Sequence, residues 1–261
     1  MNGDEGRGVI SHEVADGVGV ITIDRPERRN ALNLEVKEGV ARAVEALAAD
    51  EAVRVIVLTG AGGTFVADTD IAEMEGMRPA DHAALATDRV FTVLRSCPKV
   101  VIAAVEGYAL GGGCELALCC DLIVAGEGAK LGQPEIRVGI MPGAGGTQRL
   151  VRLMGRYRAL RLILTGEAVG AREALALGML SEVVPDGTAL GRSRDLARTV
   201  AAMPPLAVRA IKEVVGLGAE LPLEAALSLE RKAFMLLFDT EDQKEGMRAF
   251  LEKRRPSYSG R

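Results

Sequence analysis

Two glutamates stand in apolar or glycine-rich surroundings and could carry chemistry. Glu115 follows the glycine triplet Gly111–Gly113 in a short apolar stretch, and Glu135 lies in the segment GQPEIRVGIMPG. Taken singly, each glutamate is more often a solvated or capping residue than a catalyst. As a pair beside free backbone N–H groups, they offer a general acid and a general base next to an oxyanion site. Such a set of groups suits a reaction next to a carbonyl.

The glycine triplet has two interpretations. It lies between an apolar run and the stretch CELALCC, so its N–H groups would stand at the start of a short helix and could hold an anion. The alternative is a tight turn in which missing side chains let strand and helix pack closely. Nucleotide binding is not favoured, because none of the three glycine-rich stretches completes G-x-G-x-x-G and the chain has no Gly-Lys pair.

Histidine and cysteine offer little material for other chemistry. His12 and His82 are the only histidines, and the four cysteines form no C-x-x-C pair. Catalytic triads that need histidine, and histidine-rich or cysteine-rich metal sites, are therefore not favoured. We expect the cysteines to be buried, reduced thiols, and we expect no metal and no redox cofactor.

The elements that must position the glutamates alternate in the first half of the chain. Apolar runs predict strands, and apolar residues at helical spacing predict helices between them. This alternation is typical of an α/β fold, and we expect the two middle strands, at 99–107 and 121–126, to lie in one sheet. The predicted strands are 17–23, 53–60, 99–107 and 121–126, and the predicted helices are 34–50, 79–97 and 114–120.

Strand patterns become scarce after Pro142, and helical patterns follow one another. No low-complexity linker interrupts the chain, and Pro204, Pro205 and Pro222 stand where helices should begin. We therefore predict one core, residues 1–200, with a helical C-terminal region, 201–261, that serves oligomerisation. The predicted helices are 146–155, 156–166, 170–178, 189–203, 206–218 and 223–238.

Charge and composition exclude several classes of protein. The chain has 32 Lys and Arg against 36 Asp and Glu, a net charge of -4, which gives no reason to expect nucleic acid or an anionic membrane as partner. No apolar run reaches the length of a membrane span. Residues 1–14 carry acidic groups without an apolar stretch, so we expect no signal or transit peptide and a cytoplasmic location.

Several long segments match one family in the right order. They are RPERRNALN at 25–33, TFVADTDIAEM at 64–74, EGYALGGGCELALCCDLIVA at 106–125, GQPEIRVGIMPGAGGTQRL at 132–150 and TEDQKEGMRAFLEKRRP at 240–256. In these segments the chain resembles the enoyl-CoA hydratase/isomerase, or crotonase, superfamily. The resemblance implies a crotonase-like spiral of ββα units followed by helices, assembled as a homotrimer or a dimer of trimers.

The resemblance also implies roles for particular residues. The backbone N–H groups of Val66 and Gly112 are expected to form an oxyanion hole for the thioester carbonyl of an acyl-CoA. Hydratases of the family have glutamates at both positions matched by Glu115 and Glu135, whereas many isomerases keep one. Glu115 would take a proton from water as it attacks Cβ, and Glu135 would give a proton to Cα on the same face.

The candidate residues for binding coenzyme A come from several separate segments of the chain. Arg28 or Arg29 is a candidate partner for the phosphates, although a plain surface arginine before a helix is an equal alternative. Phe250 and Lys253 match positions that approach coenzyme A, often from a neighbouring subunit, and the alternative for them is helix packing and a solvated charge. Asp68 departs from the family, which usually has glycine there, and we expect it to face the coenzyme A loop, away from the alkene. The remaining candidates for substrate binding are Thr64, Ala67, Thr69, Asp70, Ile71 and Gly111.

The function implied is that of an enoyl-CoA hydratase, which adds water syn to a 2-enoyl-CoA in fatty-acid or related acyl-CoA degradation. Coenzyme A is then part of the substrate and no separate cofactor is needed. Two alternatives stay open: another crotonase activity such as Δ3,Δ2-enoyl-CoA isomerisation, or a non-catalytic relative that binds acyl-CoA or RNA. The acidic net charge and the scarcity of aromatic residues speak against RNA.

Overall fold

The computed structural model describes residues 8–261, and a six-stranded sheet forms its centre. Every neighbouring pair in this sheet is parallel except β1 with β2, which is antiparallel. The prediction that the two middle strands, now β4 and β6, lie in one sheet is confirmed, and the two are direct neighbours in it. In sheet order the strands are β1 (Ile10–Ala15), β2 (Val18–Ile23), β3 (Val55–Gly60), β4 (Val100–Val105), β6 (Leu122–Gly126) and β9 (Glu182–Val184).

A second, smaller sheet is made of β5 (Tyr108–Leu110), β7 (Lys130–Gly132) and β8 (Ala168–Gly170). The chain runs from β4 of the large sheet to β5 of the small one and then into helix α5 (Gly112–Leu118). It repeats the step from β6 to β7 and into the 3-10 helix η2 (Glu135–Val138). These are ββα units, so the predicted α/β class is confirmed, and both glutamates follow a strand of the small sheet.

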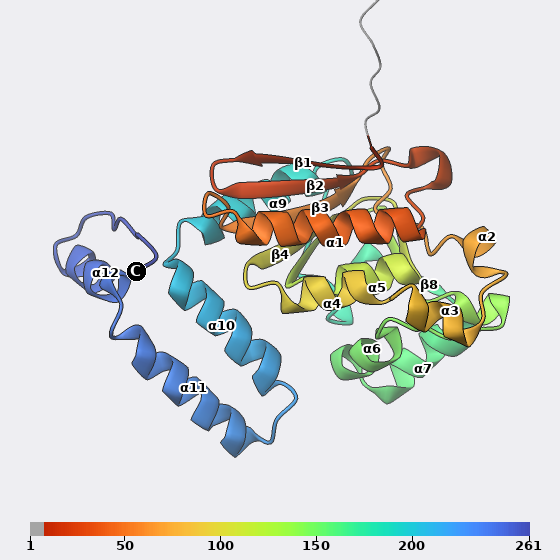
Figure 1. Cartoon of the computed structure of the whole chain (residues 1–261). Helices are drawn as coiled ribbons and strands as arrows, with labels where there is room; N and C mark the ends of the chain where they lie inside the picture. Colours follow the sequence, from red (N-terminus) through yellow and green to blue (C-terminus); the bar gives the residue numbers. More distant parts are fainter. Residues whose placement is uncertain (1–7) are drawn as a thin grey trace, which may run out of the picture.

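Helices cover both faces of the large sheet (Figure 1). Helix α1 (Leu34–Ala49) packs on one face and buries Val36, Val40 and Val44, and Asn33 caps it by accepting a hydrogen bond from Val36 N–H at 2.9 Å. Helix α9 (Ala189–Ala201) packs on the other face. Strands β2, β3 and β4 are buried between these helices, which explains their continuous apolar runs, whereas β1 at the edge is mostly exposed.

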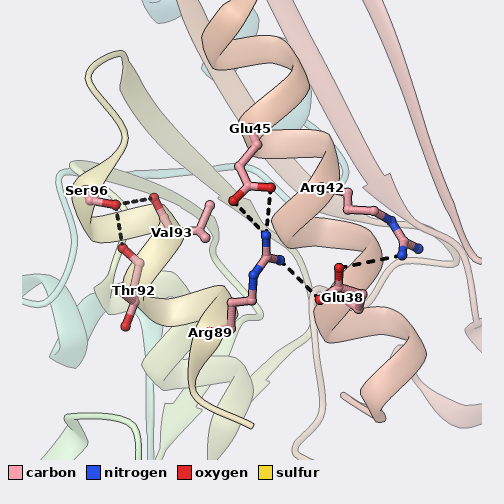
Figure 2. A network of polar contacts seen from close by, with 7 residues as sticks. All are labelled: Glu38, Arg42, Glu45, Arg89, Thr92, Val93 and Ser96. Atoms are coloured by element: carbon pink, nitrogen blue, oxygen red, sulfur yellow. Dashed lines mark hydrogen bonds and ion pairs between the residues drawn. The ribbon is translucent and has the colours of Figure 1, made fainter. Parts of the chain in front are cut away.

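The predicted single helix at 79–97 is wrong, because the chain forms α3 (Pro79–Ala84) and α4 (Arg89–Ser96) with a break between them. Ala86 has a φ of 44° at the break, a left-handed conformation that ends a helix. Arg89, the first residue of α4, donates to Glu38 and to both oxygens of Glu45 on α1, as Figure 2 shows. These ion pairs tie the segment after the break to α1.

Short strands interrupt the C-terminal half that we predicted as helical: β8 and β9 have 3 residues each. Helix α12 (Glu241–Leu251) lies after residue 238, where the last of the individually predicted helices ends. Helices α10 to α12 extend away from the sheet (Figure 1), and their role in oligomerisation stays a prediction. The remaining helices are α2 (Ile71–Met74), α6 (Gly146–Met154), α7 (Arg156–Thr165), α8 (Ala171–Ala176), α10 (Pro205–Gly218), α11 (Leu223–Leu237), α12 (Glu241–Leu251) and the 3-10 helix η1 (Pro26–Arg28).

None of the helices within residues 8–261 has the length and apolar character needed to cross a bilayer. The prediction of no targeting peptide rests partly on residues 1–7, which lie outside the described residues. Location in the cytoplasm stays a prediction.

Candidate active site

A cavity of about 260 Å³ lies where α1, α5, η2 and the segment from Asp68 to Phe91 meet. Both sequence-predicted glutamates line it, together with Asp68 and Thr69. Its lining combines acidic side chains with apolar ones, among them three methionines. The other residues around it are Lys37, Ile71, Glu73, Met74, Met77, His82, Thr87, Asp88, Phe91, Val138, Ile140, Met141, Gly143 and Ala144.

Glu115 is held by backbone donors. It lies on α5 and is 3% exposed. Its Oε1 atom accepts hydrogen bonds from Ala144 N–H at 2.7 Å and from Gly146 N–H at 2.8 Å. Burial raises the pKa of Glu115, and these two donors act against that rise because they stabilise the ionised form.

Glu135 lies at the start of η2 and is 7% exposed. Burial raises its pKa to about 7, and the negative charges of Glu115 and Asp68 add to the rise. In the orientation in which its amide nitrogen faces Glu135, buried Gln133 donates to the two carboxylate oxygens at 2.7 and 3.2 Å. These two hydrogen bonds stabilise the carboxylate and act against the rise, and with a pKa of about 7 Glu135 is partly protonated near neutral pH.

The two glutamates thus have different environments within one cavity. Glu115 accepts two backbone hydrogen bonds that favour its carboxylate, whereas Glu135 has a pKa of about 7 and can hold a proton at neutral pH. Neighbouring carboxyl groups whose pKa values are separated in this way can serve as a base and an acid. The pair can therefore take a proton from one atom and give a proton to another in a bound molecule.

Two backbone N–H groups converge beside the glutamates. Thr69 N–H and Gly112 N–H both donate to Oδ1 of Asp68, at 2.7 and 3.4 Å. Asp68 has a φ of 141°, and burial raises the pKa of its carboxyl group. We had expected Asp68 to face away from the reacting centre. That expectation is wrong, because its side chain lines the same cavity as Glu115 and Glu135.

The predicted oxyanion donor Val66 is also wrong. Its N–H donates to the carbonyl of Tyr108 at 2.9 Å in the pairing that joins Val66 to the small sheet. A buried amide engaged in a backbone pair is not free to bind a ligand. Thr69, which we had predicted only as part of the coenzyme A loop, provides the N–H that faces the same point as that of Gly112.

The other predicted substrate-binding residues are less uniformly placed. Ile71 lines the cavity, and Asp70 forms a 2.9 Å ion pair with Arg25 that ties the loop of 66–70 to the segment after β2. Phe250 is 83% exposed, and its helix α12 lies far from α2 and α3 (Figure 1), so within one chain it is not part of the cavity wall. Lys253, just after α12, is likewise not among the residues that line the cavity. Arg28, Thr64, Ala67 and Gly111 are not among the cavity-lining residues.

Lys37 and Gln133 are cavity-side residues that sequence reasoning missed. Lys37 lies half-buried on α1, and burial lowers the pKa of its ammonium group while Glu73 and Glu115 act in the opposite direction. In the sequence, Lys37 stands three residues before Val40 in an amphipathic helix, and nothing there distinguishes it from an ordinary exposed lysine. Gln133 stands directly before Pro134 and Glu135, and only its burial beside Glu135 reveals its role.

Comparison with known proteins gives one consistent family. The model for enoyl-CoA hydratase/isomerase matches residues 13–261. The chain is 44% identical over 245 residues to the 2,3-dehydroadipyl-CoA hydratase of Escherichia coli, covering 93% of this chain and 95% of that protein. It is 42% identical to the crotonyl-CoA hydratase of Syntrophomonas wolfei, covering 94% and 96%. An enoyl-CoA hydratase structure from Geobacillus kaustophilus superposes with a TM-score of 0.94 at 46% identity, covering 97% and 99%.

Proposed function

The chain belongs to the enoyl-CoA hydratase/isomerase family, and we propose that it is a hydratase that adds water across the double bond of a 2-enoyl-CoA thioester. The product would be a 3-hydroxyacyl-CoA, as in fatty-acid or related acyl-CoA degradation. One observation carries the proposal most: two buried glutamates, Glu115 held by two backbone donors and Glu135 with a pKa of about 7, share a cavity with two convergent backbone N–H groups.

The proposed mechanism assigns one task to each group. Glu115, whose carboxylate accepts two backbone hydrogen bonds, takes a proton from water as the water oxygen bonds to Cβ. The electron pair of the double bond moves toward the thioester, and the resulting enolate oxygen accepts from Thr69 N–H and Gly112 N–H. Glu135, protonated near neutral pH, gives its proton to Cα. The product gains the hydroxyl group of the water at Cβ and the proton of Glu135 at Cα, and the proton that Glu115 took up is returned to Glu135 through solvent before the next turnover.

The same proposal extends to assembly. Apolar side chains on α11 and α12 lie open to solvent, including Leu236 at 72%, Phe250 at 83% and Leu251 at 80%. Exposed apolar residues gathered on neighbouring helices favour contact with another copy. A homotrimer or a dimer of trimers would cover them and could bring Phe250 and Lys253 of one chain near the cavity of another.

The direct test is product analysis with crotonyl-CoA, the substrate named for one relative. A hydratase consumes the conjugated thioester absorbance and gains the mass of one water. An isomerase given a 3-enoyl-CoA returns the 2-enoyl isomer without a mass change. Binding without either reaction would support a non-catalytic acyl-CoA-binding protein. Asp88→Asn, which removes an exposed carboxylate from the cavity wall, is the control for a general change in cavity charge.

A further inference from the structure

Asp68 places a carboxylate oxygen at the point where the backbone N–H groups of Thr69 and Gly112 converge. Oδ1 of Asp68 accepts from Thr69 N–H at 2.7 Å and from Gly112 N–H at 3.4 Å. These are the donors proposed above for the thioester oxygen. A negatively charged oxygen between two amide donors has the same charge and the same hydrogen-bonding needs as an enolate oxygen.

The backbone is shaped to hold the carboxylate there. Asp68 has a φ of 141°, which side chains rarely adopt, so the loop keeps a strained residue at this point. Gly111 gives the carboxylate its space, since a Cβ on Gly111 would stand 2.0 Å from Oδ1 and 2.5 Å from Cγ of Asp68. Asp68 therefore packs directly against the backbone that leads into α5.

The surrounding charges do not provide another reason for this position. The carboxyl groups of Glu115 and Glu135 line the same cavity and repel a further negative charge. The hydrogen bonds to Thr69 N–H and Gly112 N–H are the favourable polar contacts of the side chain. The carboxylate is thus held by the amides themselves.

We propose that Asp68 is a built-in competitor for the thioester oxygen: its carboxylate occupies the two amides in the free enzyme, and an acyl-CoA binds productively only after displacing it. The inference rests on the proposed function for the identity of the ligand. A ligand with a carbonyl next to sulfur must compete with Asp68, whereas a ligand without that carbonyl binds without moving it. Asp68 then sets how strongly the enzyme prefers a thioester over other coenzyme A derivatives.

The experiment compares two ligands that differ in this carbonyl. Butyryl-CoA has the thioester oxygen, and S-butyl-CoA is the thioether of the same chain length without it. Calorimetric titration gives the Kd of each for wild type and for Asp68→Gly, a change that suits the backbone because glycine readily adopts a φ of 141°. We expect Asp68→Gly to tighten butyryl-CoA binding by about 10-fold, as for one charge-assisted hydrogen bond, and S-butyl-CoA by less than about 2-fold.

Two further variants separate charge from occupancy. Asp68→Asn keeps the size of the side chain but makes its oxygen a weaker acceptor, and we expect a gain for butyryl-CoA about half as large on a logarithmic scale. Asp88→Asn removes a negative charge from the same cavity without touching the amides, so the ratio of the two Kd values should stay that of wild type.

The outcomes are distinct. Equal tightening of both ligands by Asp68→Gly means that Asp68 repels coenzyme A in general, and the competitor proposal is then wrong. An unchanged Kd for both ligands also overturns it. Hydration of crotonyl-CoA by the wild type is measured separately. If Asp68→Gly changes the ratio of the two Kd values but the wild type does not hydrate crotonyl-CoA, the competitor proposal is supported and the hydratase proposal is refuted. If the wild type hydrates crotonyl-CoA but the ratio of the two Kd values is unchanged, the hydratase proposal is supported and the competitor proposal is refuted. Failure of every variant to bind butyryl-CoA refutes both.

Discussion

Gly146 contacts both Glu115 and Gln133, the residue beside Glu135. Its N–H donates to Oε1 of Glu115 at 2.8 Å. A Cβ at Gly146 would stand 2.8, 2.9 and 3.0 Å from the three heavy atoms of the Gln133 side-chain amide, the group that reaches Glu135. Gly146 therefore provides a hydrogen-bond donor to Glu115 and, by lacking a side chain, leaves room for Gln133 beside Glu135.

Replacing this glycine should damage both glutamates together. In Gly146→Ala the new methyl group must displace Gln133, which is fully buried and has little room to move. We expect a loss of stability of about 1–3 kcal/mol, the usual cost of overpacking. A shift of about 1 Å at the glutamates should lower kcat by up to about 100-fold. Thermal unfolding and crotonyl-CoA hydration measure the two effects.

Gly191→Ala is the matched control for this change. Gly191 lies on α9, and a Cβ there meets no atom within 4 Å. Alanine should stabilise the helix by about 1 kcal/mol and leave hydration as in the wild type. If both glycine variants lowered kcat alike, contact with Gln133 would not be the cause.

The rate of hydration should depend on pH through both glutamates. Glu135 has a pKa of about 7 and must be protonated to act as the acid, so kcat/KM should fall as pH rises above about 7. Glu115 must be ionised, and because burial raises its pKa, the rate should also fall on the acid side. Glu135→Gln should abolish the alkaline fall in its residual activity. A pH profile unchanged in Glu135→Gln would assign that limb to another group.

The free energy of unfolding should also depend on pH through the raised pKa of Glu135. The folded-state pKa of Glu135, about 7, lies above the ordinary value of 4.5, so the folded chain binds more protons than the unfolded chain in this window. The stability contributed by Glu135 is therefore complete below about pH 4.5 and is lost as pH rises through about 7. Relative to wild type, Glu135→Gln should gain roughly 1–3 kcal/mol in unfolding free energy between pH 5 and pH 8, measured by urea denaturation. A constant difference across that range would contradict the raised pKa.

The sequence was informative where a pattern reports burial. The apolar runs of β3 and β4 identify strands covered on both faces, and the spacing of Val36, Val40 and Val44 identifies α1. Glu115 and Glu135 stand out because carboxylates are rare in such surroundings. Strands of 3 residues such as β8 and β9 are too short for a period to emerge.

The errors in the site arise from backbone geometry that residue types do not encode. Val66 and Thr69 are 3 residues apart. Which of their N–H groups stays outside the backbone pairing depends on the register by which Val66 pairs with the small sheet. The direction of the Asp68 side chain depends on its φ of 141°, a backbone conformation that the residue type alone does not predict. The break before α4 likewise depends on the left-handed Ala86.

Assembly should depend on the apolar residues of α11. Leu236 is 72% exposed, so Leu236→Glu should cost little in a single chain but should place a charge inside an interface. We expect the wild type to have a mass in light scattering that is a multiple of 27.5 kDa, and the variant to shift toward a single chain. Val14→Glu, on β1, is a control at an apolar residue 43% exposed. A compact, active wild-type monomer would refute the trimer and the sharing of Phe250 between chains.

Glu115 and Glu135 should behave as one unit in hydration, because a single transition state needs a base at the water oxygen and an acid at Cα. Replacing either with glutamine keeps the volume but removes a titrating group, so each single variant should lose about 10²–10⁴-fold in kcat. Binding of butyryl-CoA should largely persist, since Thr69 N–H and Gly112 N–H are backbone donors that neither change removes. The double variant should cost much less than the product of the two single losses, because the second group has no function once the first is missing. Rapid-mixing assays with crotonyl-CoA measure all three. If Glu115→Gln kept near-normal hydration while Glu135→Gln abolished it, a single glutamate would carry the chemistry, and the isomerase alternative would replace the hydratase.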